Sequence, residues 1–210
     1  MHAPAEPEFL ACRIDGYTEL PPGKLANLVT YLEMTRPPPP RAPARPDLTL
    51  VETTRDPDAY RALYRRIGAR WLWMGRLALS DAALARTLAG PRLVSRTLVR
   101  AGEAIGLMEV AFGEDGEAEL AYFGLVPEAI GGGSGRWLMD AALAQAFARP
   151  IARLTVHTCT FDHPDAVAFY VRSGFRPYKR AIEIHDDPRL AGYYPRETAA
   201  ERWPVIQPAT

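Results

Sequence analysis

A run of glycines in the middle of the chain restricts the possible fold more than any other stretch. Gly131-Gly132-Gly133-Ser134-Gly135 follows residues 120–126, whose aromatic and branched side chains predict a β-strand that ends at Pro127. A helix is predicted to begin at Ser134 or Gly135, because apolar residues then recur at helical spacing, at Met139, Leu143, Ala146 and Phe147. A glycine-rich loop before a helix N-terminus presents free N–H groups, so we expect an anion to bind here, most naturally a phosphate.

The spacing of the glycines decides between the known phosphate-binding loops. A Walker loop requires Gly-Lys-Ser/Thr before its helix, whereas Gly135 is followed by Arg136 and Trp137. The dinucleotide fingerprint G-x-G-x-x-G, started at Gly131, would require glycine at position 136, which is arginine. The sequence therefore excludes both of these nucleotide sites.

Residues 125–135 instead resemble, without a gap, V-x-P-x-x-(Arg/Gln)-G-x-G-x-(Gly/Ala), the acetyl-CoA-binding motif of the GNAT superfamily of acetyl-CoA-dependent N-acyltransferases. Ile130 departs from it, since the family has arginine or glutamine there. The resemblance implies that acetyl-CoA is held by the main chain of Leu125, Val126, Gly131, Gly132, Gly133, Ser134, Gly135 and Arg136, with the pyrophosphate on the helix N-terminus. The alternative is a glycine-rich turn that binds no ligand.

A second stretch, residues 163–175, resembles the family signature N-x-x-A-x-x-(aliphatic or aromatic)-Tyr-x-x-x-Gly-Phe. The resemblance assigns Tyr170 as the general acid that protonates the sulfur of CoA. His163 stands where the family has asparagine, and we expect it to cap the following helix. The alternative is a core tyrosine packed against Val167 and Val171.

Three residues are candidates for the general base that takes a proton from the attacking amine. Glu119 lies at the start of the central strand, where relatives often have a glutamate that acts through water. Glu109 lies on the preceding strand and His157 on the following one, and histidine titrates near neutral pH. Solvent could also carry the proton, so the choice stays open. Trp71, Trp73 and Tyr122 are expected to line an acceptor pocket or to form an aromatic core cluster.

The order of elements predicted from residue 48 onward is strand, two helices, three strands, helix, strand, helix and strand. The resemblance covers about residues 48–185 and implies an α/β (α+β) fold, a mixed, mostly antiparallel central sheet flanked by helices. The family ends on a hairpin, but here one strand precedes the tail, so a strand is expected to be missing at one edge. Residues 25–34 are strand-like and are predicted to pair with this sheet or with that of a second subunit.

These expectations divide the chain into three parts. Residues 1–46 form an N-terminal strand extension with a proline-rich spacer at 37–46, residues 47–186 form the acetyltransferase domain, and residues 187–210 form a C-terminal tail.

Composition limits the partners and the compartment. The formal net charge is +0, which gives no electrostatic reason to expect nucleic acid or an anionic membrane as a partner, and no apolar run approaches a membrane span. Cys12 and Cys159 lack metal-ligand spacing, so we expect no metal and reduced thiols in a cytoplasmic protein. The predicted function is an N-acetyltransferase that uses acetyl-CoA and acts on a small-molecule amine. A second copy of the chain, in a homodimer, is the other partner considered. The alternative is a CoA-binding sensor or assembly module of the same fold without turnover.

Overall fold

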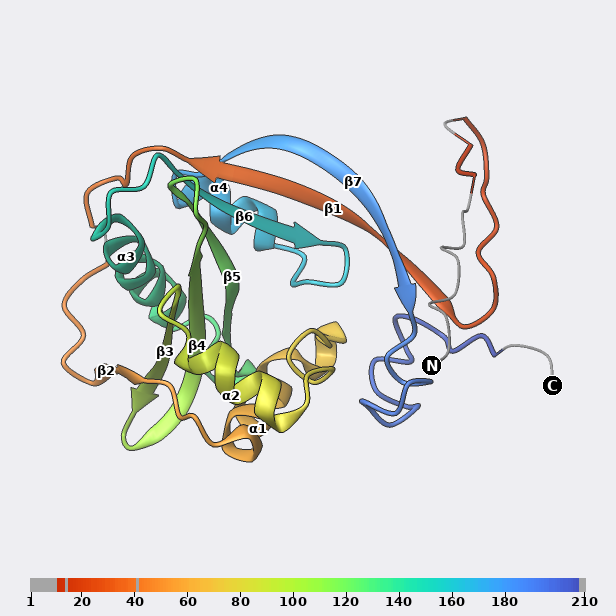
Figure 1. Cartoon of the computed structure of the whole chain (residues 1–210), viewed down its shortest axis with the longest axis horizontal. Helices are drawn as coiled ribbons and strands as arrows, with labels where there is room; N and C mark the ends of the chain where they lie inside the picture. The colour runs from red at the N-terminus through yellow and green to blue at the C-terminus, as the bar shows by residue number, and fades with distance from the viewer. Residues whose placement is uncertain (1–10, 14, 41, 208–210) are drawn as a thin grey trace.

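The computed structural model describes residues 11–13, 15–40 and 42–207. One seven-stranded sheet runs through the molecule, with helices packed against it (Figure 1). The strands are β1 (Lys24–Met34), β2 (Leu48–Glu52), β3 (Leu93–Arg100), β4 (Glu103–Phe112), β5 (Glu117–Leu125), β6 (Arg153–Cys159) and β7 (Arg176–Asp186). The helices are α1 (Pro57–Gly68), α2 (Asp81–Ala89), α3 (Ser134–Phe147) and α4 (Ala166–Arg172), with short 3-10 turns η1 (Ala69–Trp71) and η2 (Pro127–Ala129). The predicted mixed, mostly antiparallel fold is confirmed.

The N-terminal strand does not lie where the sequence placed the missing strand. The order across the sheet is β2-β3-β4-β5-β6-β1-β7, so β1 fills an inner position and β7 forms the edge. The expectation of a strand missing at one edge is therefore wrong. No described residue after β7 forms a strand that pairs with it as a hairpin. The strand next to β7 is instead β1, from the N-terminal part of the chain.

β1 is paired antiparallel on both sides, which explains why it can be an inner strand. Val29–Met34 pair with β6, and Lys24–Glu33 pair with β7. Leu32 of this strand has no exposed surface, whereas Leu28, four residues earlier, is 45% exposed. Glu33 adds ion pairs to Arg153 on β6 and Arg176 on β7, at 3.1 and 2.7 Å. The predicted pairing of residues 25–34 with the chain's own sheet is thus confirmed.

Local sequence signals set the helices between β2 and β3. The Asp56 carboxylate accepts a hydrogen bond from the Asp58 N–H and Pro57 opens α1, as expected for a helix N-terminus. Ser80 caps α2 by accepting from the Ala83 N–H, and that helix ends before Gly90.

Two neighbouring residues of β5 show that α1 and α3 cover opposite faces of the sheet. A Cβ placed on Gly124 would lie 2.5 Å from Ile67 of α1, so glycine allows that helix to approach. The side chain of Leu125 instead reaches 3.7 Å from the Cβ position of Gly135 on α3. Successive residues of a strand point to opposite faces, so the central strand is enclosed by a helix on each side.

The C-terminal segment, residues 187–207, packs against the rest of the molecule. Arg189 and Asp187 form a fully buried ion pair at 2.7 Å, and Arg189 also donates to the carbonyl oxygens of Thr198 and Trp203. The Tyr194 hydroxyl donates to the Trp73 carbonyl at 2.6 Å, which fixes the segment beside the η1 loop. Among the described residues, no helix is long and apolar enough to cross a membrane.

Candidate active site

The central sheet opens between β5 and β6. These two strands are parallel and pair only from Glu117 to Glu119, opposite Arg153 to Thr155. Beyond that point β5 continues to Leu125 alongside β4 alone. An opening of this kind leaves main-chain N–H and C=O groups of β5 without a ladder partner, available to a ligand that enters the gap.

The glycine-rich loop lies directly after this open end of β5. Gly131 and Gly133 have φ of +95° and +79°, which only glycine adopts without strain, and α3 begins at Ser134 as predicted. The first N–H groups of a helix lack partners within the helix, and here they face a loop free of side chains. A Cβ on Gly131 or Gly132 would meet no atom within 4 Å, so the space in front of the loop is open. This geometry fits the pyrophosphate of CoA.

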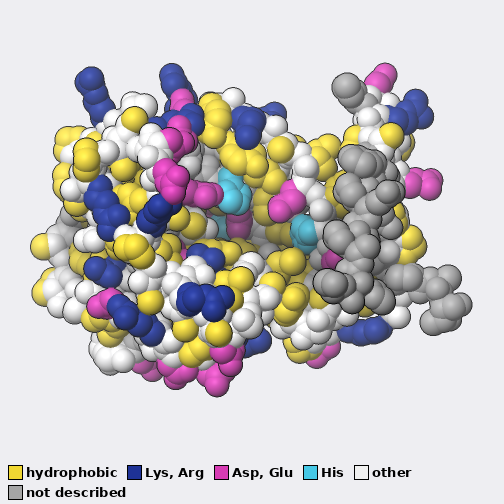
Figure 2. Space-filling model, in the orientation of Figure 1, with side chains coloured by type: hydrophobic (Ala, Val, Ile, Leu, Met, Phe, Trp, Pro, Cys, Tyr) yellow, Lys and Arg dark blue, Asp and Glu magenta, His cyan; other side chains and the backbone are white. Residues whose placement is uncertain are grey.

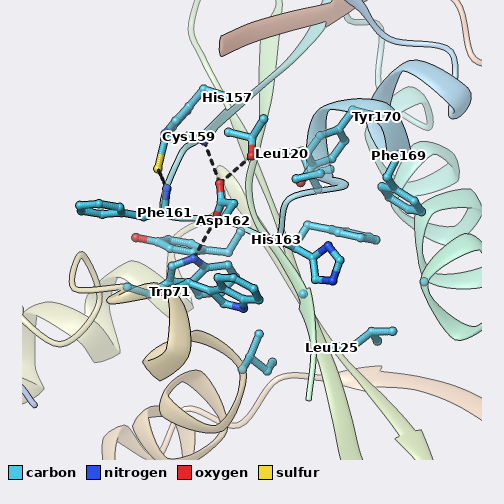
Figure 3. Close-up of a pocket in the computed structure, with 18 of the residues that line it drawn as sticks. Trp71, Leu120, Leu125, His157, Cys159, Phe161, Asp162, His163, Phe169 and Tyr170 are labelled. Atoms are coloured by element: carbon cyan, nitrogen blue, oxygen red, sulfur yellow. Dashed lines mark hydrogen bonds between the residues drawn. The ribbon is translucent and has the colours of Figure 1, made fainter. Parts of the chain in front are cut away.

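A cavity of about 750 Å³ joins the loop to the opening in the sheet. Figure 2 shows acidic and histidine side chains around a hollow near the middle of one face, and Figure 3 shows the residues that line the cavity. The predicted site residues in its wall are Leu125, Gly131, Gly133, Gly135, Arg136, His157 and Tyr170, together with the aromatic residues Trp71, Trp73 and Tyr122.

Other predicted site residues lie behind the wall. Val126 is 1% exposed and Ser134 is fully buried, so neither presents a side chain to the cavity. The Val126 N–H donates to the Ile105 carbonyl on β4 at 2.9 Å. Because main-chain groups of successive strand residues point to opposite sides, the Leu125 N–H points toward the opening instead. Of the two, Leu125 is therefore the residue whose main-chain N–H faces the opening.

Tyr170 reaches the cavity from α4 (Figure 3). Its ring is 7% exposed and packs against Phe123 and Phe175, with Phe169 beside it. Burial raises the pKa of the Tyr170 hydroxyl, with a smaller contribution from the negative charge of Asp162. The hydroxyl is therefore protonated at neutral pH, but the raised pKa makes it a weaker acid, so donation to a thiolate requires that the phenolate be stabilised.

Glu119 and His157 are brought together by the short parallel pairing of β5 and β6. The Glu119 Oε1 and His157 Nδ1 atoms are 2.8 Å apart, and both side chains are nearly half-exposed. The hydrogen bond from His157 lowers the pKa of Glu119, and the same bond raises the pKa of His157. His157 lines the cavity, so the two candidates for the base form one hydrogen-bonded pair in which Glu119 orients the imidazole.

Glu109, the third candidate, is placed elsewhere. It is fully buried and accepts from the Tyr60 hydroxyl at 2.7 Å, the Ser95 hydroxyl at 3.2 Å and the Arg76 guanidinium at 2.6 Å. These bonds satisfy a carboxylate inside the core, beneath Tyr122, over whose ring Arg76 lies. Glu109 stabilises the wall of the site rather than reaching a substrate.

Asp162 is a cavity residue that sequence reasoning missed. Its carboxylate accepts from Trp73 Nε1 at 3.1 Å, Thr158 Oγ1 at 2.6 Å and the Cys159 N–H at 3.0 Å. These bonds join the end of β6 to the loop after η1. Burial, with the charge of Asp162, raises the pKa of the Cys159 thiol to about 12, so it is not a thiolate nucleophile. His163, predicted to cap α4, accepts from the Asp165 N–H at 3.2 Å.

Arg45, in the spacer between β1 and β2, is a second residue that the sequence did not single out. Its Nη1 atom donates to the Gly132 carbonyl at 2.7 Å, and Asp47 holds its guanidinium through two further bonds of 2.7 and 2.8 Å. The Ala42 N–H donates to Asp140 on α3 at 2.7 Å, so the spacer is fixed along the loop and helix. The carbonyl and the next N–H of a trans peptide point in opposite directions, so this contact directs the Gly133 N–H away from Arg45.

The fold and the site define a mixed α/β protein whose central sheet opens beside a phosphate-type loop. The Acetyltransferase (GNAT) family model matches residues 51–175, more than half of the sequence, and the chain belongs to this family of acetyltransferases. A comparison with curated proteins gives no match.

Solved structures of low sequence identity share the fold. A GCN5-related N-acetyltransferase from Sphaerobacter thermophilus is 14% identical, with a TM-score of 0.57 over 79% of this chain and 52% of its own. An acetyltransferase from Thermus thermophilus is 20% identical, with a TM-score of 0.50 over 66% and 96%. The PaiA N-acetyltransferase from Thermoplasma acidophilum, solved with coenzyme A, is 16% identical, with a TM-score of 0.50 over 66% and 98%. This chain therefore spans about half the length of the Sphaerobacter protein.

Proposed function

We propose that the protein is an N-acetyltransferase that moves the acetyl group of acetyl-CoA directly to an amine of a small molecule in a ternary complex. One observation supports this most strongly: a single cavity runs from the glycine-rich loop, past the opening between β5 and β6, to His157 and beyond. Its volume of about 750 Å³ lies within the range of small-molecule sites. The cavity has room for the arm of the donor from one end and an acceptor from the other.

Residues around the opening suit the steps of acyl transfer. Acetyl-CoA supplies the thioester, whose C–S bond breaks as the N–C bond to the amine forms. In this proposal the Leu125 N–H stabilises the negative charge that develops on the carbonyl oxygen. His157, oriented by Glu119, accepts the proton of the amine, and Tyr170 donates a proton to the departing sulfur.

A CoA-binding module without turnover is the second candidate, and Ile130 favours it. This side chain is 50% exposed at the position where the family motif has arginine or glutamine, so a contact to the cofactor is lost. Binding of CoA would be expected from either protein, but only an enzyme would release free CoA thiol when an amine is added.

The two functions are separated by measuring thiol release from acetyl-CoA across a panel of small amines, alongside calorimetric titration of CoA. We expect amine-dependent thiol release by the parent protein. Tyr170→Phe keeps the ring and its packing but lacks the transferable proton, so turnover should fall by roughly 10²- to 10⁴-fold with CoA affinity unchanged. Binding of CoA without thiol release for any amine would favour the sensor, and equal turnover by Tyr170→Phe would remove its role as general acid.

A further inference from the structure

The end of the cavity farthest from the glycine-rich loop is lined by hydrogen-bond acceptors. Asp162 and Glu183 both contribute to the cavity wall, which also contains His157 and His185. The charges of Asp162 and Glu183 add to that of Glu119 in raising the pKa of His157. These two carboxylates thus line the cavity of a chain whose formal net charge is +0.

Asn27 on β1 adds an independent sign of a ligand at this end. Its side chain is 4% exposed and lies in the cavity wall. Its Nδ2 atom donates to Glu183 Oε2 at 3.0 Å, across the β1–β7 pairing. Its Oδ1 atom is buried and has no hydrogen-bond partner among the described residues. A buried acceptor without a donor is costly, so a ligand that brings N–H groups would satisfy it.

The side chains between these acceptors are aromatic. Trp73, Tyr122 and Phe161 line the cavity, and the Trp73 indole is held in place by its bond to Asp162. Aromatic faces attract organic cations, and the attraction is stronger where water is excluded. Carboxylates and aromatic rings together form a site for an ammonium group that carries an alkyl chain.

The position of these groups shows which ammonium they would hold. The amine that attacks must lose a proton, and nearby carboxylates would oppose this by favouring its charged form. Glu183 lies on β7, two strands beyond β6 in the sheet, and its register partner Asn27 is four residues along β1 from Tyr31, which pairs with His157, so Glu183 is displaced from His157 both across and along the sheet. The carboxylate is therefore suited to a second group that stays charged while the first is acetylated.

We propose that the acceptor is a diamine, and that Glu183, with Asn27 and the field of Asp162, binds the ammonium that is not acetylated. This rests on the proposed N-acetyltransferase function and names the substrate class of the same site. It also gives β1 a part in specificity, because the N-terminal strand supplies Asn27 and fixes Glu183 on the neighbouring strand.

The experiment compares pentylamine with 1,5-diaminopentane, and the two compounds differ only in the second amino group. We expect kcat/KM for the diamine to exceed that for pentylamine at least tenfold in the parent protein. Glu183→Gln keeps an oxygen for Asn27 but removes the charge, so the diamine should lose most of this advantage while pentylamine is unaffected. Asp186→Asn, three residues along β7 in an ion pair with Lys24, removes one charge elsewhere and should change neither substrate.

Calorimetric titration of the diamine into the protein saturated with CoA provides a readout that does not need turnover. If the diamine binds, Glu183→Gln weakens this binding, and no amine is acetylated, the diamine site is retained and the proposed acetyltransferase function is rejected. Acetylation of both substrates with equal kcat/KM, or a diamine preference that Glu183→Gln leaves intact, would overturn the diamine site and leave the acetyltransferase in place. If the diamine does not bind and is not preferred over pentylamine, the diamine site is overturned as well.

Discussion

At the scale of single residues, Arg45 occupies a position that bears on the departure from the family motif. Ile130 supplies no charge to the cofactor loop, but the Arg45 guanidinium lies on the same loop, bonded to the Gly132 carbonyl and 3.6 Å from the Cβ position of Gly133. A cation there adds to the positive potential of the helix N-terminus and holds the loop in shape. The spacer thus contributes to the region where the pyrophosphate is expected.

We expect Arg45→Ala to raise the KM for acetyl-CoA about tenfold with little change in kcat, since it removes one charge-assisted bond from the loop. Steady-state kinetics at varied acetyl-CoA and fixed amine would measure this. Ile130→Arg, introduced into the same variant, returns a cation to the motif position and should restore part of the affinity. An unchanged KM for Arg45→Ala would show that the contact shapes the spacer only.

The Glu119–His157 pair predicts a pH dependence whose sign follows from the two shifts. Neutral His157 is the form that accepts a proton, so kcat/KM should fall as the pH drops through its pKa, which the bond to Glu119 raises above 6.5. In Glu119→Gln the charge is gone, the pKa of His157 moves back down, and the acidic limb of the profile should shift to lower pH. Glu117→Gln, two residues earlier on β5, is the matched control and should leave the limb in place. A profile that Glu119→Gln does not move would exclude His157 as the base.

The same pair affects stability in a defined pH window. The contribution of Glu119, whose pKa is lowered, is present above its usual value of 4.5 and is lost as the pH falls through the lowered pKa. The contribution of His157 is present below 6.5 and is lost as the pH rises through the raised pKa. The pair therefore stabilises the fold most between these two usual values.

At the scale of elements, the glycine-rich loop and α3 can be tested by a pair of substitutions with the same backbone strain. Gly133 and Gly102 both have positive φ, +79° and +83°, and valine resists this conformation at either place. We expect Gly133→Val to abolish CoA binding and Gly102→Val, in the turn between β3 and β4, to keep it, with similar losses of stability. Calorimetry on the folded variants would measure both. Parent-like CoA binding by Gly133→Val would mean that the loop is not the cofactor site.

Some elements were predicted from the sequence more accurately than others. The accuracy was higher where the residues that determine an element are close together in the sequence. The strand, loop and helix around Gly131 were predicted well, because each signal lies within a few residues of the next. The position of β1 was predicted only in part, since its pattern shows that it is a strand but not which strands flank it. Its partners are more than a hundred residues away, so only the whole sheet determines its place.

The same limit applies to the site. Glu119 and His157 were separate candidates in the sequence, and their contact depends on a pairing of β5 and β6 that extends over three residues. Arg45, Asn27 and Asp162 match no local motif, and each enters the site from a different part of the sheet or its connections. Motifs locate the cofactor loop, whereas the opposite end of the cavity requires the folded chain.

At the scale of the whole molecule, the inner position of β1 predicts that the N-terminal part is required for folding. Without residues 1–46 the edge strand β7 loses β1, its strand neighbour among the described residues, and β6 loses one side of its pairing. Exposed strand edges and the apolar surface left by Leu32 would favour aggregation. We expect the truncated chain to be insoluble or to melt far below the full chain.

A milder test uses two leucines of the same strand. Leu32 has no exposed surface, so Leu32→Ala should lower the free energy of unfolding by about 2–5 kcal/mol, the usual cost of a buried leucine. Leu28 is 45% exposed, and Leu28→Ala should cost less than about 1 kcal/mol. Urea denaturation of the full-length variants measures both values and requires no truncated protein. Equal small losses for the two variants, together with a truncated chain that melts at the temperature of the full chain, would show that β1 is dispensable and would contradict its place between β6 and β7.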